Sequence, residues 1–330
     1  MGRDPSKPPS LPHDLEDIYF GPEVKRPLRV VAWPRGLPGT LRCISFGNDF
    51  NCSVEGVAWP EGLRWICFGD RFDGVIEGTK FPCGLEEILF GEKFNQPVER
   101  VNWPSTLKKL SFGYAFDQPL DGASLPCGLE QLLLDASFDQ PIECIVWPED
   151  LKRLVFGARF DQPVVNVSLP LGLRELVFRL SFNQPVEGVA WPQGLRHLAF
   201  GARFDQAVSR LPPALEQLSF GYFFNRSVKP IAWPKTLRRL TFGHDFDRDI
   251  EGVDWPASLR CIVFGYCFNR PIDRVQWPAG LEQITFGGCF NHSVDGVAWP
   301  DSLRRLTFGY AFTQSLEGVS WPARLAYLSL

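Results

Sequence analysis

Residues 85–106 read LEEILFGEKFNQPVERVNWPST, and variants of this twenty-two-residue unit fill nearly all of the 330-residue chain. Each unit opens with Leu-x-x-Leu-x-Phe, continues through Gly, Phe and Asn or Asp, and closes on an apolar residue, usually Trp, followed by Pro. Fifteen of these openings occur, from Leu15 to Leu325. Positions in a unit are numbered 1–22 from its first Leu. A strict period of this size predicts a solenoid, in which each turn buries its apolar face against its neighbours.

The opening of each unit has the alternation of a β-strand. Apolar residues at positions 4 and 6 flank a polar or small residue at position 5, as in Leu306-Thr307-Phe308. Proline at position 20 removes a backbone donor and fixes φ, so the return leg should be extended or polyproline-like and not helical. The expected fold is a repeat solenoid with one parallel strand per unit.

Asn or Asp follows the second Phe in nearly every unit, for example at Asn95 and Asp117. We expect these side chains to accept hydrogen bonds from backbone N–H groups of the turns. A column of carboxylates also suits calcium, but the chain has no glycine-aspartate nonapeptide and no EF-hand loop. We therefore expect no metal and no cofactor. The Trp column is interpreted as core and not as a sugar-stacking row, because Leu and Phe replace Trp in some units.

Two departures from the repeat divide the chain. Four extra residues between Pro34 and Thr40 predict a bulged turn or cap, so we assign a disordered tail to 1–10 and an N-terminal cap to about 11–40. The unit at about 200–220 lacks two residues and should produce a local kink. We expect residues 11–330 to form a single solenoid.

Composition narrows the class of protein. The net charge of −4 disfavours nucleic-acid binding. No apolar stretch is long enough for a membrane helix, and the first ten residues resemble no secretory signal. The nine cysteines follow no disulfide framework, so we expect a cytoplasmic protein with reduced thiols. Cys267 and Cys289 share a column in adjacent units, where a disulfide is the alternative.

The run Phe-Gly-x-x-Phe-Asn-Gln-Pro-Val, at Phe90–Val98 and again with small changes at Phe178–Val186, resembles the FNIP repeat. This family is grouped with leucine-rich repeats, and the resemblance covers roughly residues 11–330, with Trp-Pro where the family usually has Leu-Pro. It implies a right-handed, leucine-rich-repeat-like coil that recognises other proteins, sometimes behind an F-box that connects to a ubiquitin ligase. About ten residues precede the first repeat, so we expect no F-box in this chain.

Positions 2, 3, 5, 8 and 9 are not needed for the hydrophobic core. We expect their side chains to face solvent and to include the residues that bind a partner. Positions 2 and 3 together hold thirteen basic and eight acidic residues, whereas position 15 is mostly acidic. Opposite charges in neighbouring units can simply neutralise each other across strands. Toward the C-terminus, however, arginines occur near aromatic residues, the combination enriched at protein interfaces. The predicted partner-binding residues are Arg238, Arg239, Arg260, Arg304, Arg305, Tyr222, Phe223, Tyr266 and Tyr310.

A non-enzymatic protein-interaction scaffold is therefore the expected function. The four histidines fall in unrelated units, and no catalytic or phosphate-binding motif occurs. The alternatives are a carbohydrate-binding module, or the substrate-recognition part of a ubiquitin ligase that lacks its own F-box. The chain stops at Leu330 on a strand, so weak self-association through that strand edge is also expected.

Overall fold

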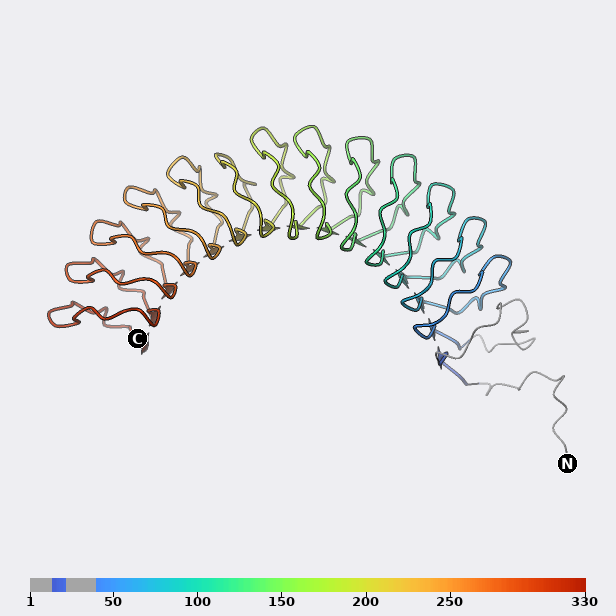
Figure 1. Ribbon diagram of the computed structural model, residues 1–330, viewed down its shortest axis with the longest axis horizontal. Coiled ribbons are helices and arrows are strands. Elements are labelled where there is room, and N and C mark those ends of the chain that lie inside the picture. Colours follow the sequence, from blue (N-terminus) through green and yellow to red (C-terminus); the bar gives the residue numbers. More distant parts are fainter. Residues whose placement is uncertain (1–13, 22–39) are drawn as a thin grey trace, which may run out of the picture. The chain divides into compact units, whose positions relative to one another are not determined.

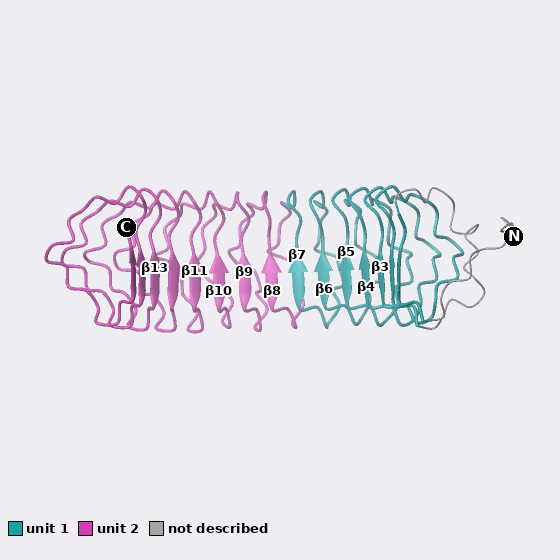
Figure 2. Ribbon diagram, turned by 90° about the horizontal axis from the view of Figure 1, so that it is seen from below, with its two compact units in different colours: residues 1–160 teal, residues 161–330 magenta. Residues whose placement is uncertain are grey.

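The computed structural model describes residues 14–21 and 40–330. These residues form two compact units, which divide between Phe160 and Asp161 (Figure 2). The predicted tail at 1–10 and most of the predicted cap at 11–40, with its insertion, lie outside the described residues. The expectation that residues 11–330 form a single solenoid stays a prediction.

Fifteen three-residue strands occur in the described residues, each at positions 3–5 of a repeat. Unit 1 contains β1 (Asp17–Tyr19), β2 (Cys43–Ser45), β3 (Trp65–Cys67), β4 (Glu87–Leu89), β5 (Lys109–Ser111), β6 (Gln131–Leu133) and β7 (Arg153–Val155). Unit 2 contains β8 (Glu175–Val177), β9 (His197–Ala199), β10 (Gln217–Ser219), β11 (Arg239–Thr241), β12 (Cys261–Val263), β13 (Gln283–Thr285), β14 (Arg305–Thr307) and β15 (Tyr327–Ser329). The described residues contain no helix, and hence none that could cross a membrane.

Within each unit, every strand pairs in parallel with the next strand in the sequence, and equivalent positions face each other. In unit 2, for example, Gln217 pairs with Arg239 and Leu218 with Leu240. The strands line one edge of the stacked turns, and the return legs project from the other side (Figure 1). The predicted solenoid with one parallel strand per repeat and a non-helical return leg is confirmed.

Stacked phenylalanines form the centre of nearly every described turn. Phe242 and Phe246, at positions 6 and 10 of one turn, have ring centroids 3.9 Å apart. The next turn continues both columns, and the rings of Phe246 and Phe268 are nearly parallel with their centroids 6.0 Å apart. Leu240 and Phe246 are fully buried. Burial of such side chains is the main stabilising contribution, because each contributes on the order of 1.5–3 kcal/mol relative to exposure.

The Asn/Asp column joins successive turns as predicted. Asp117 Oδ1 accepts hydrogen bonds from the backbone N–H of Asp139 and the side-chain amide of Gln140, both at 2.9 Å. In unit 2 the same arrangement joins Asn183 to the N–H of Asp205, also at 2.9 Å. Each turn thus supplies an acceptor that the next turn would otherwise lack.

The tryptophans of position 19 are buried or half-buried in the described residues, as expected for a core column. Trp255 is only 7% exposed, and its neighbour Trp233 lies 5.5 Å away between ring centroids. The indole N–H of each lies buried without a hydrogen-bond partner in the part of the chain that the structure describes. These residues therefore act through their volume, which explains why Leu211 serves in the same column.

The two-residue deletion near residue 210 shortens the return leg and leaves the strand register unchanged. Strand β10 stays in register with β9, with Gln217 opposite His197, so the strand ladder passes the short unit without a break. The return leg gains an isolated parallel bridge between Arg210 and Ala232. The predicted kink therefore does not interrupt the sheet of unit 2.

Candidate functional site

The turns that follow β10, β11, β12 and β14 carry a row of surface rings at position 8, here called the aromatic row: Tyr222, His244, Tyr266 and Tyr310. The backbone brings these turns together, because the N–H of Asp245 donates to Tyr222 O at 2.9 Å and the N–H of Cys267 donates to His244 O at 2.8 Å. A repeated backbone contact of this kind places side chains of one column directly over each other.

Three of these rings form a continuous stack. The centroids of Tyr222 and His244 are 4.3 Å apart with the rings 6° from parallel, and those of His244 and Tyr266 are 4.8 Å apart with 4° between the planes. His244 is thus the middle ring of the stack. The four histidines fall in unrelated repeats, but the position of His244 in the column of Tyr222, Tyr266 and Tyr310 is readable from the repeat.

Gly288 explains how Tyr310 joins the row from two turns away. A Cβ at Gly288 would lie 2.6 Å from the Tyr266 ring and 2.8 Å from the Tyr310 ring. The missing side chain lets these two rings approach to 6.0 Å, and their hydroxyls form a hydrogen bond. Phe223 adds an exposed ring that packs edge-on against Tyr222 at 4.9 Å.

The arrangement of the rings bears on the kind of ligand. A sugar usually stacks on a free aromatic face, but His244 has a ring against each of its faces. The exposed rings at the two ends of the row, Tyr222 and Tyr310, each carry a polar hydroxyl. Exposed Tyr edges with polar tips are typical of protein interfaces.

The predicted arginines lie at the other end of the strands. Arg239 and Arg305 are the first residues of β11 and β14, and Arg238, Arg260 and Arg304 lie at position 2, just before their strands. The aromatic row follows the strands at position 8. The structure therefore separates the predicted patch into an arginine row and an aromatic row, with no hydrogen bond, ion pair or ring contact between the two sets among the described residues.

Charge pairing differs along the strand side. In unit 1, Lys108 and Lys109 form ion pairs with Glu86 and Glu87 at 3.1 and 3.3 Å. This is the cross-strand neutralisation that the sequence analysis considered. Lys152 forms the equivalent ion pair with Glu130, one turn earlier, at 3.0 Å.

The C-terminal arginines behave differently. Arg260 is held by the carbonyls of Ala257 and Leu259 at 2.9 and 3.1 Å, and it approaches Glu282 at 4.0 Å. The other four, however, are exposed and form no ion pair with any described residue: Arg238, Arg239, Arg304 and Arg305. The guanidinium of Arg305 covers the ring of Tyr327 at 4.6 Å. Four exposed arginines without an ion pair among the described residues therefore lie at one end of the strands of unit 2.

Small side chains at position 5 form the floor between the two rows. They are half-buried and short: Thr241, Val263, Thr285 and Thr307. These side chains are shorter than the arginines and tyrosines of the two rows.

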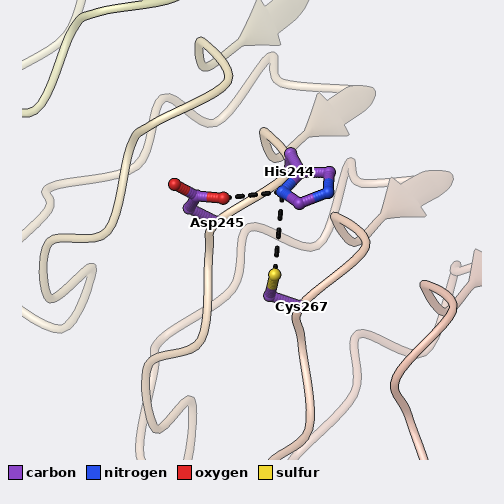
Figure 3. A group of neighbouring side chains, drawn as sticks. All are labelled: His244, Asp245 and Cys267. Carbon is purple, nitrogen blue, oxygen red and sulfur yellow. Dashed lines mark hydrogen bonds and ion pairs between the residues drawn. The ribbon is translucent and has the colours of Figure 1, made fainter.

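A second group of polar side chains lies beside the aromatic row. His244 Nδ1 is 2.6 Å from Asp245 Oδ1 and 3.6 Å from Cys267 Sγ (Figure 3). These three residue types also make up a nucleophile, base and orienting acid, but in such a triad the acid and the nucleophile contact different ring nitrogens. Here both contact Nδ1. Burial, with Asp245 and other nearby acidic groups, raises the pKa of Cys267, so its thiol is a poor nucleophile.

Comparisons with known proteins agree with the fold. Two segments, residues 72–115 and 182–223, match the model of the FNIP Repeat family. No curated protein matches the chain. The crystal structure of CroV588, described as a novel circular LRR protein, is similar over 89% of this chain with 34% identity and a TM-score of 0.80. The present chain spans 47% of the length of CroV588.

Two bacterial structures share the fold. YopM from Yersinia enterocolitica WA-314 is 21% identical with a TM-score of 0.57, and the match covers 88% of this chain and 60% of YopM. An internalin, InlF, from Listeria monocytogenes is 12% identical with a TM-score of 0.59, and the match covers 84% of each chain. Leucine-rich-repeat-like solenoids generally serve as protein-interaction scaffolds without an active site. Residues 72–115 and 182–223 thus carry FNIP repeats, within a solenoid of parallel strands that resembles leucine-rich-repeat proteins in fold.

Proposed function

We propose that the chain is a non-enzymatic scaffold that binds a partner protein on the strand side of unit 2. The observation that carries this proposal is the pair of rows on either side of the strands. Exposed, unpaired Arg238, Arg239, Arg304 and Arg305 lie at one end, and the aromatic row lies at the other. Arginine and tyrosine dominate the binding energy of many protein interfaces.

We infer the chemistry of the partner from the two rows. The partner presents carboxylates to the arginine row, and apolar or amide groups to the rings of Tyr222, Phe223 and Tyr310. These rings are 46%, 49% and 75% exposed, which is ample for contact without rearrangement. We place this recognition in the cytoplasm, where the nine cysteines, all free thiols in the structure, stay reduced.

Affinity purification from cells that express the chain tests the proposal. The bait is the full chain, and the key variant is the double reversal Arg239→Glu/Arg305→Glu. A matched control, Arg100→Glu/Arg274→Glu, makes the same change in net charge at position 16, outside the two rows; these side chains are 81% and 75% exposed.

We expect the first variant to lose at least about tenfold of the captured partner, as for hot-spot residues. The control should retain it. Equal capture by all three baits would overturn the proposal. A glycan array on which the wild-type chain binds a defined sugar, with the same loss in the Arg239 and Arg305 variant, would replace it with the carbohydrate alternative.

A further inference from the structure

The group formed by His244, Asp245 and Cys267 is built by the stacking of two turns. The ligand atoms Nδ1, a carboxylate oxygen and Sγ all lie within 4.8 Å of one another, and each residue is half-buried (Figure 3). The N–H of Cys267 donates to the carbonyl of His244 at 2.8 Å, so the backbone itself fixes the spacing of the two turns.

The orientation of the imidazole is fixed as well. His244 lies between the rings of Tyr222 and Tyr266, within 6° of parallel to both. Stacking on both faces holds the plane of the ring, and in this plane Nδ1 faces both Asp245 and Cys267. Imidazoles that bind metals are likewise held in one orientation, usually through a hydrogen bond to the second ring nitrogen.

The shared nitrogen leaves one of its two contacts unsatisfied. If Nδ1 carries a proton, it donates to Asp245 and cannot accept from the thiol of Cys267. If Nδ1 is unprotonated, it accepts from Cys267 and faces the carboxylate of Asp245 at 2.6 Å with no proton between them. A cation that binds the lone pair of Nδ1, the carboxylate and a thiolate satisfies all three groups together.

We propose that His244, Asp245 and Cys267 form a binding site for a divalent transition-metal ion, with zinc as the fitting ion. One nitrogen, one oxygen and one sulfur are the ligands that Zn²⁺ takes, whereas Mg²⁺ and Ca²⁺ avoid sulfur. Metal–ligand distances of about 2.0–2.3 Å in a tetrahedron place nitrogen and sulfur about 3.6 Å apart. Nδ1 and Sγ are 3.6 Å apart in the structure.

The carboxylate must move to complete the site. The same tetrahedron requires about 3.4 Å between nitrogen and oxygen and about 3.6 Å between oxygen and sulfur. Asp245 Oδ1 must therefore move away from Nδ1 by somewhat less than an ångström and lie about 3.6 Å from Cys267 Sγ, from which it now lies within 4.8 Å. Rotation of the half-buried carboxyl achieves this, because the backbone of Asp245 is held separately through its bond to Tyr222 O. Water completes the fourth position, since the group is open to solvent. The ion would join the turns after β11 and β12 next to the aromatic row.

Titration of the metal-free, reduced full chain with Co²⁺, a spectroscopic substitute for Zn²⁺, tests the site. We expect one Co²⁺ per chain, a thiolate-to-cobalt charge-transfer band, and displacement of the cobalt by Zn²⁺. Cys267→Ser should remove the band, and both His244→Ala and the isosteric Asp245→Asn should weaken binding by about tenfold or more, the scale known for groups that support a metal.

Two control variants keep the test specific. Cys144→Ser removes an exposed thiol of unit 1, and His197→Ala removes an exposed histidine of β9, so both should bind cobalt as the wild type does. Circular dichroism of each variant verifies the fold. Absence of the charge-transfer band in the wild type, or a band of equal strength in Cys267→Ser, would overturn the proposal. Neither result depends on the protein-binding proposal, because no partner is present.

Discussion

The backbone N–H of Asp139 donates a 2.9 Å hydrogen bond to Oδ1 of Asp117, one turn earlier in the solenoid. Asp117 also accepts from Gln140, so a single side chain supplies two acceptor bonds to the next turn. The same relation recurs in both units. The Asn and Asp side chains at position 11 therefore join each turn to the next through hydrogen bonds. This column is called the Asn/Asp seam.

Removing that acceptor should destabilise unit 1. Asp117→Ala leaves the part-buried N–H of Asp139 unpaired, and we expect the free energy of unfolding to fall by about 1–3 kcal/mol. Asp117→Asn keeps Oδ1 and should stay within about 1 kcal/mol of the wild type. Urea denaturation followed by circular dichroism measures both changes, and equal losses in the two variants would show that the acceptor is not the cause.

Glycine at position 7 is required by the distance between turns. A Cβ on Gly243 would lie 1.6 Å from the carbonyl oxygen of Gly221, so Gly243→Ala forces backbone movement. We expect a loss of about 1–3 kcal/mol or more, the cost of overpacking. Gly252 at position 16 has φ of 73° and open space around it, so Gly252→Asn is the tolerated control. Thermal melting that ranks Gly252→Asn as the more damaging change would contradict this explanation.

The buried tryptophans should tolerate phenylalanine. The indole N–H of Trp255 has no partner among the described residues, so Trp255→Phe removes an unpaired polar group together with some packing. The two effects oppose each other, and we expect a change of about 1 kcal/mol or less. Trp255→Ala should cost about 3–5 kcal/mol through the cavity it creates. Similar losses in the two variants, measured by urea denaturation, would mean that the indole N–H makes a stabilising contact.

Thiol reactivity should follow burial and charge. Burial, a hydrogen bond to Asp17 and nearby acidic groups raise the pKa of Cys43 to about 11 from the usual 9.0. At pH 8 its thiolate fraction is therefore about 100-fold below that of an ordinary thiol. Timed alkylation with peptide mass spectrometry should label exposed Cys144 long before Cys43, and the rate at Cys43 should keep rising up to pH 10. Equal early labelling of both would contradict the assignment.

Much of this molecule follows from its sequence because one unit is repeated. A pattern that recurs in fifteen repeats stays clear even where one repeat departs from it. The strand of each repeat, the Asn/Asp seam and the Trp column in the core could therefore all be predicted. Glycine is required at position 7 because the backbone of the preceding turn lies against it. This contact exists only between stacked turns, so the sequence of a single repeat does not reveal it.

The site depends on departures from the repeat, and these are harder to predict. His244 and Cys267 lie in adjacent columns of adjacent units, 23 residues apart, so no linear motif joins them. The gap at Gly288 admits Tyr310 to the aromatic row only once the turns are stacked. The separation of arginines from aromatics required knowing where each strand begins and ends. Residue types alone gave a single patch.

The binding face itself is the central claim, and site-specific photo-cross-linking tests it most directly. Benzoylphenylalanine is introduced in place of Tyr310, in the aromatic row, or in place of Asp295, an exposed acidic residue at position 15 of the preceding repeat. After irradiation in cells that express the chain, we predict a discrete protein adduct from position 310 and none from position 295. An adduct from position 295 with none from position 310 would place the partner on another side of the solenoid and contradict the account.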